Sequence, residues 1–173
     1  PFPYKVKDVV LLGRVNNTGY FSQPSAYDYE IVEAAMADMG ISHLRDRAYT
    51  DISGGERQLV MIARVLAQEP KILVMDEPTA NLDYGNMIRV INKLRMLKEK
   101  GYGIIMTTHS PDQAFMCDSS VVLLQNRGPL TFGPAVDVIT EQNMRSAYGI
   151  DVKIIEFVDT YGRLVRMCSP LLG

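Results

Sequence analysis

The chain has 173 residues, 47% of them hydrophobic and 22% charged, and a formal net charge of −2. This length and apolar content predict one sizeable core, or one core with a small appendage, and exclude a disordered chain. Lys and Arg are spread without clustering, which argues against a nucleic-acid partner. No apolar run approaches the roughly 20 residues that span a bilayer, and the start has no signal-peptide pattern. Any membrane association is therefore expected to come through a partner.

The amino-terminal third is predicted to be helical. Residues 1–4 contain two prolines and no methionine, so they are interpreted as loop entered from upstream sequence, with residue 1 as a cut. Apolar residues recur at helical spacing over residues 6–12 and again from about 27 to 39, where Gly40 ends the pattern. Short connected helices are expected here.

Strands and helices alternate in the middle of the chain. The apolar residues within 59–66 form one face of a predicted helix, which begins near Gly54 and stops before Pro70. The uninterrupted apolar run 72–75 predicts a buried parallel strand, and residues 104–107 predict a second one. Between them, residues 87–97 predict a helix that ends at Gly101.

The carboxyl-terminal part predicts a helix over 111–117, a strand over 121–124, a turn at 126–129, and a returning strand over 130–132. Residues 152–158 and 163–167 predict an appended β-hairpin. Cys117 and Cys168 lack metal-ligand spacing and the density of a disulfide scaffold, which suits a reducing compartment. Both are expected to serve in packing. The alternation of strand and helix predicts an α/β fold.

Two carboxylates, Asp76 and Glu77, end the first predicted strand. Neighbouring side chains on a strand point to different sides, so one carboxylate can hold Mg²⁺ through water while the other addresses a nucleophilic water. Taken alone, the pair could equally be solvated acids at a strand end.

Ser53, Gly54 and Gly55 place a hydroxyl and unobstructed backbone amides at the start of a helix, where an anion such as phosphate is favoured. The alternative is an ordinary Ser N-cap followed by glycines. His109 follows the second strand and could hydrogen-bond a terminal phosphate, or be a polar loop residue. Asp83 could be only a turn or cap residue.

The joint order of these signals decides between the alternatives. A glycine signature (Ile52 to Gln58), a helix, a strand with Asp-Glu, a short loop with Asp, a helix and a strand followed by His occur in sequence. This order resembles the ATP-binding subunit of ABC transporters, over nearly the whole chain up to about Ile150. Ile52 stands where the family usually has Leu, and Glu56 where it often has Gln.

The resemblance implies a role for each site residue. Ser53, Gly54 and Gly55 match the signature motif, which contacts the γ-phosphate of ATP bound by the opposite subunit. The resemblance also implies a role for four single residues: Asp76 as the Walker B magnesium carboxylate, Glu77 as the catalytic base, Asp83 as the D-loop aspartate and His109 as the switch histidine. The implied cofactors are ATP and Mg²⁺.

No Gly-Lys pair occurs in the chain, so it contains no G-x-x-x-x-G-K-[ST] phosphate loop. In the family, the amino-terminal half supplies that loop, the adenine-stacking aromatic residue and the Q-loop glutamine. The chain is therefore expected to be an amino-terminally truncated segment that hardly binds or hydrolyses ATP. The strand that carries the loop would lie between the strands at 104–107 and 121–124, so both are expected to have an unpaired edge, open to rearranged pairing, self-association or complementation.

The predicted fold class is α/β, an incomplete P-loop NTPase core with a parallel sheet, a helical subdomain and a carboxyl-terminal β-hairpin. The predicted domains are a helical subdomain with the signature (1–68), half of a RecA-like core with Walker B, D-loop and H-loop (69–150), and the hairpin extension (151–173).

Residues 6–14 and 79–86 resemble importers of iron–siderophore complexes, haem or vitamin B12. The resemblance then implies a second nucleotide-binding subunit as homodimer partner, transmembrane permease subunits, and a peripheral position on the cytoplasmic face of the plasma membrane. Val9 to Arg14 is the candidate permease contact, although Val9 and Val10 favour internal packing. Two alternatives are a soluble ABC ATPase of DNA repair or translation, and a non-catalytic interaction module.

Overall fold

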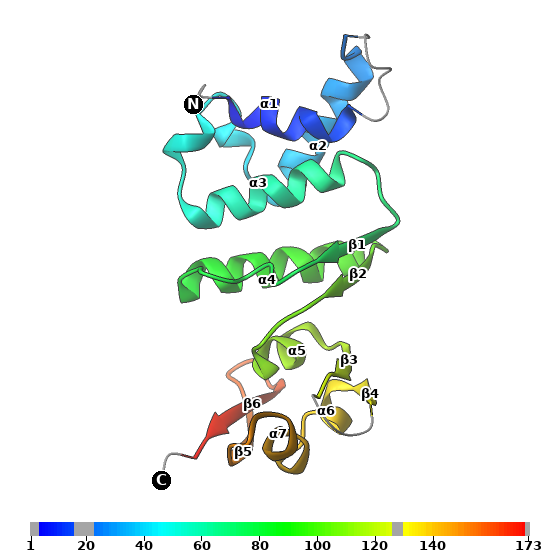
Figure 1. Ribbon diagram of the computed structural model, residues 1–173. Coiled ribbons are helices and arrows are strands. Elements are labelled where there is room, and N and C mark those ends of the chain that lie inside the picture. Colours follow the sequence, from blue (N-terminus) through cyan, green and yellow to red (C-terminus); the bar gives the residue numbers. More distant parts are fainter. Residues whose placement is uncertain (1–3, 16–22, 126–129, 172–173) are drawn as a thin grey trace. The chain divides into compact units, whose positions relative to one another are not determined.

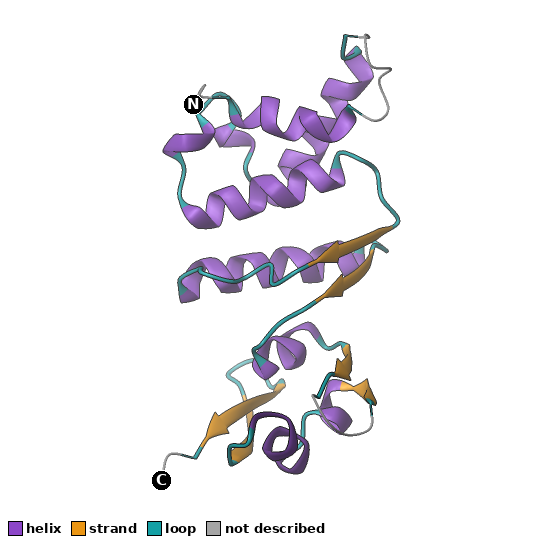
Figure 2. Cartoon of the chain, viewed as in Figure 1, coloured by secondary structure: helices purple, strands orange, loops and turns teal. Residues whose placement is uncertain are grey.

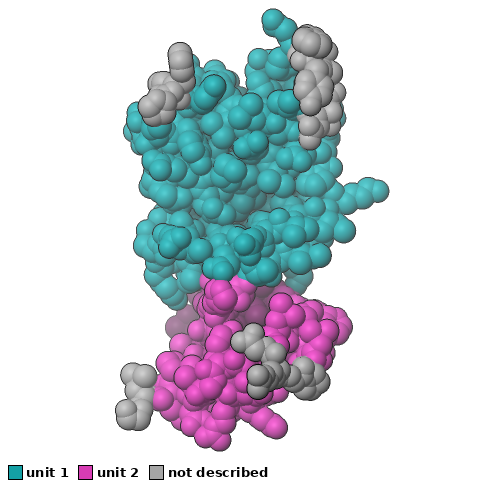
Figure 3. Space-filling view, viewed as in Figure 1, with its two compact units in different colours: residues 1–107 teal, residues 108–173 magenta. Residues whose placement is uncertain are grey.

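The computed structural model describes residues 4–15, 23–125 and 130–171. The chain divides into two compact units, residues 1–107 and residues 108–173 (Figure 3). This division falls inside the predicted RecA-like half, so the three-part organisation by motif stays a prediction. Each unit is described by itself.

Helices form most of unit 1 (Figure 2). They comprise α1 (Val6–Leu11), the 3-10 turn η1 (Leu12–Arg14), α2 (Ala26–Met39) and α3 (Gly54–Leu66), with short 3-10 turns η2 (Ser42–Leu44) and η3 (Tyr49–Asp51) between the last two. The predicted helices at 6–12, 27–39 and 59–66 are confirmed. Gly40 ends α2 in the left-handed conformation (φ 72°), which a glycine adopts without strain.

A βαβ unit follows. Strand β1 (Ile72–Met75) pairs in parallel with β2 (Gly103–Met106), and α4 (Tyr84–Glu99) connects them (Figure 1). The predicted parallel strands are confirmed, but the prediction that both are buried is wrong. Leu73 is buried, whereas Val74 is 74% and Ile105 60% exposed. The helices cover one face of the pair only, so side chains that alternate along each strand alternate between core and solvent.

The core of unit 1 joins all four helices to β1. Burial of these side chains, at about 25 cal/mol per Å² of apolar surface, is the main force that holds the helices together. The largest fully buried members are Met36, Met39, Ile41, Leu44, Leu73 and Leu97.

Unit 2 contains α5 (Pro111–Cys117), β3 (Ser120–Leu123), β4 (Thr131–Pro134), α6 (Ala135–Val138), α7 (Glu141–Tyr148), β5 (Val152–Val158) and β6 (Leu164–Pro170). The predicted helix, the strand pair and the carboxyl-terminal hairpin are confirmed, with β3–β4 and β5–β6 both antiparallel. The turn predicted at 126–129 lies outside the described residues. α6 and α7 were not predicted.

The described strands form three separate two-stranded sheets. Within the described residues, β2 pairs only with β1, and β3 only with β4. This agrees with the unpaired edges expected for these two strands.

A buried ion pair fixes η1 to the start of α2. Arg14 Nε lies 2.9 Å from Asp28 Oδ1, and both side chains are almost fully buried. The same guanidinium donates to the carbonyl oxygen of Ala67 at 2.8 Å and to Glu69 at 2.7 Å, at the end of α3. Arg14 therefore ties together three helical elements that are distant in sequence.

The Asp28 carboxylate makes the stability of unit 1 depend on pH. The Ser25 hydroxyl, the Arg14 guanidinium and the Ser25 backbone N–H hold its pKa at about 2. A carboxyl pKa that is lower in the folded chain stabilises the fold above the unfolded pKa of 3.8, and this contribution is lost as the pH falls towards about 2. We expect the urea midpoint of the chain to fall over this pH range, and to fall less steeply in Asp28→Asn. The exposed Asp51→Asn is the control, and an unchanged slope in Asp28→Asn would contradict the assignment.

Candidate functional site: a pair of carboxylates and a capped helix start

Asp76 and Glu77 lie directly after β1, as predicted, and Thr107 directly after β2. The Thr107 hydroxyl donates to Asp76 Oδ1 at 2.5 Å and accepts the backbone N–H of Glu77 at 3.0 Å. Because both strands run in parallel, their carboxyl ends meet at one edge, where ligands of α/β sheets bind. The structure thus places two acids and a hydroxyl at the expected edge.

Glu77 adopts a left-handed backbone conformation with φ 43°, although it is not glycine. Asn81, four residues later, has φ 59°. Such conformations cost of order 1–3 kcal/mol and persist only where neighbouring groups enforce them; they cluster at functional sites. The turn after β1 is thus held in a defined shape, and Pro78 and Thr79 within it are buried.

The predicted signature residues begin α3. Ser53 is its N-cap: the Ser53 hydroxyl accepts the backbone N–H of Glu56 at 3.3 Å. Glu56 Oε2 in turn accepts the Ser53 N–H at 2.7 Å and the Ser53 O–H at 2.8 Å, which lowers the pKa of Glu56. An ionised carboxylate only accepts, so the Ser53 hydroxyl must leave Glu56 before it can donate to a phosphate.

Gly55 packs directly against α4. A Cβ at this position would overlap the Asn86 side chain, so the close approach requires glycine. Asp83 caps α4 and fixes Asn86: it accepts the Asn86 backbone N–H at 2.8 Å and side-chain N–H at 2.6 Å. The backbone N–H of Asn86 is the main cause of the lowered pKa of Asp83. The structure therefore joins the predicted signature to the predicted D-loop aspartate through one asparagine.

His109 lies in unit 2, in the turn before α5, and its side chain is exposed. The neighbouring Thr108 hydroxyl donates to Gln113 at 2.9 Å and accepts the Ser110 N–H at 3.0 Å, which shapes this turn. The role of His109 as a phosphate sensor stays a prediction.

The donors at the end of β1 suit Mg²⁺. Thr107 occupies Oδ1 of Asp76, and Asp76 is exposed. Mg²⁺ keeps several waters and takes one or two carboxylates together with substrate phosphates, so a single exposed acid is an adequate protein ligand. No cluster of three metal-ligating side chains occurs among the described residues.

Sequence reasoning missed two residues of this site, Thr107 and Asn86. Thr107 is the last residue of the strand predicted over 104–107, and a polar residue at the end of an apolar strand was the available sign. Asn86 lies in the first turn of α4, and only its contact with Gly55 shows that it matters.

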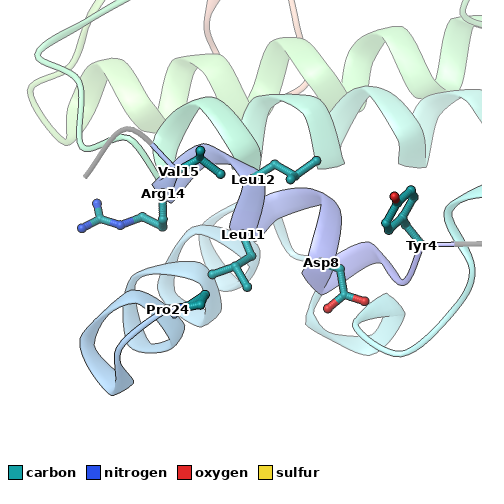
Figure 4. A pocket seen from close by; sticks show the side chains of 7 residues that line it. All are labelled: Tyr4, Asp8, Leu11, Leu12, Arg14, Val15 and Pro24. Carbon is teal, nitrogen blue, oxygen red and sulfur yellow. The ribbon is translucent and has the colours of Figure 1, made fainter. Parts of the chain in front are cut away.

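A shallow hollow of about 250 Å³ lies at α1 and η1 (Figure 4). It is apolar for the most part, and Leu12 and Val15 on its wall are about half exposed. The hollow overlaps the predicted contact region Val9 to Arg14, in which Val9 and Val10 are themselves buried, as favoured. Its lining residues are Tyr4, Asp8, Leu11, Leu12, Arg14, Val15 and Pro24.

Known proteins resemble the chain in sequence and in structure. The family model described as ABC transporter matches residues 6–80. An uncharacterized ABC transporter ATP-binding protein of Haemophilus influenzae is 38% identical over 147 residues, which are 85% of this chain and 56% of the relative. The molybdate import ATP-binding protein MolC of the same organism is 34% identical over 149 residues, covering 86% and 58% of the two chains. This chain thus spans little more than half the length of these curated relatives.

A solved structure of a metal-chelate type ABC transporter in an inward-facing conformation superposes with a TM-score of 0.92 at 30% identity, over 99% of this chain and 68% of that one. The superposition includes nearly every described element, so the predicted fold class is confirmed together with the recognised relationship. The chain belongs to the family of ABC transporter ATP-binding proteins.

Proposed function

We propose that this chain supplies the signature, Walker B, D-loop and switch residues of an ATPase that powers an importer. The observation that carries this proposal is the arrangement after β1 and β2, where Asp76 and a strained Glu77 share one hydroxyl. An acid in a fixed backbone conformation at a sheet edge suits the positioning of a water for attack on phosphate.

Each site residue then has a role. Glu77 is the general base, and Asp76 holds Mg²⁺ through water. Mg²⁺, when bound, neutralises charge that develops on the phosphates. Ser53, Gly54 and Gly55 donate to the γ-phosphate of ATP held by the opposite subunit. His109 hydrogen-bonds a terminal phosphate, and Asp83 fixes the signature helix through Asn86.

The 173 residues alone are proposed to bind ATP weakly. They contain no phosphate loop, whose amides and lysine form charge-assisted hydrogen bonds of about 1.5–3 kcal/mol each. We define a hybrid ATPase as this chain joined after the amino-terminal half of a family member, which supplies that loop. ATP hydrolysis by the hybrid ATPase, and its absence in the chain alone, test the proposal.

The hollow at α1 and η1 is proposed to receive a cytoplasmic helix of a transmembrane permease. Its apolar wall with half-exposed Leu12 and Val15 suits the apolar side of a helix. No helix in the described part of the chain is long and apolar enough to cross a membrane. The family resemblance implies a peripheral position on the cytoplasmic face, through the permease, and a homodimer of two ATP-binding subunits, and both are part of the proposal.

Leu12→Asp is expected to weaken binding of the chain to its permease about tenfold or more, because it places a charge in a desolvated contact. The measurement is copurification with the permease at increasing salt. Leu124→Asp, at an exposed leucine in unit 2, is the matched control. Equal loss in both variants would mean that the hollow is not the contact.

The imported ligand is proposed to contain a metal. The named relatives import molybdate or belong to a metal-chelate type transporter, and the motifs resemble importers of iron–siderophore complexes, haem or cobalamin. Stimulation of ATP hydrolysis by the loaded transporter, compared across these ligands, would identify the class.

A further inference from the structure

Thr107 stands opposite Asp76 in the parallel pair. The register pairs Met75 with Met106, and the Thr107 backbone N–H donates to the carbonyl oxygen of Met75 at 3.1 Å. The ladder of β1 and β2 therefore extends one residue beyond the end of β2. Its last rung places the Thr107 side chain beside the two carboxylates that follow β1.

One hydroxyl serves both acids. The Thr107 O–H donates to Asp76 Oδ1, and the same oxygen accepts the Glu77 N–H. A hydroxyl can do both at once, because it has one donor and two acceptor lone pairs. Valine, which has the same shape, can do neither.

These two hydrogen bonds fix the orientation of the Asp76 and Glu77 side chains. The Glu77 N–H belongs to the peptide that joins Asp76 to Glu77, so holding it fixes the plane from which both side chains project. Glu77 has a left-handed φ of 43°, a conformation that needs such support. The bond to Oδ1 also turns the Asp76 carboxylate, and the second oxygen remains for the water shell of a cation.

The two hydrogen bonds of the Thr107 hydroxyl are expected to add little to the stability of the fold. Thr107 and Asp76 are both exposed, where water replaces a lost hydrogen bond at little cost. The strained Glu77 is more easily explained by a demand on geometry.

We propose that Thr107 is a positioning residue for both Asp76 and Glu77, which it sets at the angles that ATP hydrolysis requires. This inference rests on the proposed function of those two acids. In this proposal Thr107 acts through these two acids and not through a contact with the nucleotide.

Thr107→Val and Thr107→Ser separate the hydroxyl from the shape of the side chain. In the hybrid ATPase, Thr107→Val is expected to lower kcat about ten- to hundredfold, as misplacement of catalytic groups does, with the KM for ATP changed less than about threefold. Thr107→Ser, which keeps the hydroxyl, is expected to retain most of kcat. Wild-type kcat in Thr107→Val, or an equal loss in both variants, would overturn the proposal.

Amide hydrogen exchange in the 173-residue chain tests the same contact without turnover. The Glu77 amide is expected to exchange about tenfold faster in Thr107→Val than in Thr107→Ser, with equal melting temperatures. Equal exchange would overturn the proposal. If exchange behaves as expected while Glu77→Gln leaves hydrolysis by the hybrid ATPase unchanged, the contact stands and the proposed function of Glu77 fails, so the two failures are distinguishable.

Discussion

Glu77→Gln in the hybrid ATPase is expected to lower kcat by about 10²–10⁴-fold, the usual contribution of a general base. Glutamine keeps the shape of the side chain but cannot take a proton from water. The backbone N–H that Thr107 accepts is unaffected, so the turn after β1 should keep its conformation. ATP binding should stay within about threefold, because the variant loses only an interaction made during hydrolysis.

The matched control is Glu99→Gln, at the exposed last residue of α4. Hydrolysis should be measured under single-turnover conditions, together with binding of a fluorescent ATP analogue. Loss of kcat with intact binding supports Glu77 as base. Undiminished kcat would leave the family relationship in place, remove the assigned chemistry, and favour the non-catalytic interaction module.

Gly13→Ala is expected to destabilise unit 1 by about 2 kcal/mol, or to prevent folding, because η1 lies directly on α3. A Cβ on Gly13 would overlap the backbone carbonyl oxygen of Arg64 and lie 3.1 Å from the Cβ of Ala67. Backbone atoms cannot move aside as a side-chain end can, so two helices must separate. The measurement is the urea midpoint of the chain.

Gly54→Ala is the control for this substitution. Its Cβ would meet nothing within 4 Å, and alanine favours a helix over glycine. We expect Gly54→Ala to fold at least as stably as the wild type. Equal destabilisation by both changes would show that the contact with Arg64 is not the cause of the loss.

The sequence predicted the elements that carry strong local signals. α2 and α3 have Ser N-caps with acids three residues later, and Gly40 follows α2. α7 has comparable caps in Thr140 and Gly149, but only Met144 of its residues is buried, so its apolar pattern was too weak to find. α6 is four residues long and shows no helical period at all.

The burial of side chains and the contacts between distant parts of the chain were harder to predict from the sequence. The apolar run of β1 predicted two covered faces, because a sequence does not tell how many layers pack on a strand. Asp76 and Glu77 were found from their motif. Their bond to Thr107 joins residues 31 apart and depends on the register of β1 with β2, which the sequence does not encode locally.

ATP turnover by the hybrid ATPase, measured beside the 173-residue chain alone, tests the central claim most directly. The account predicts Mg²⁺-dependent hydrolysis by the hybrid ATPase and none by the chain alone, because the proposed signature and Walker B residues lie in these 173 residues and no phosphate loop does. A folded hybrid ATPase that binds ATP without hydrolysing it, or equal turnover by the chain alone, would contradict it.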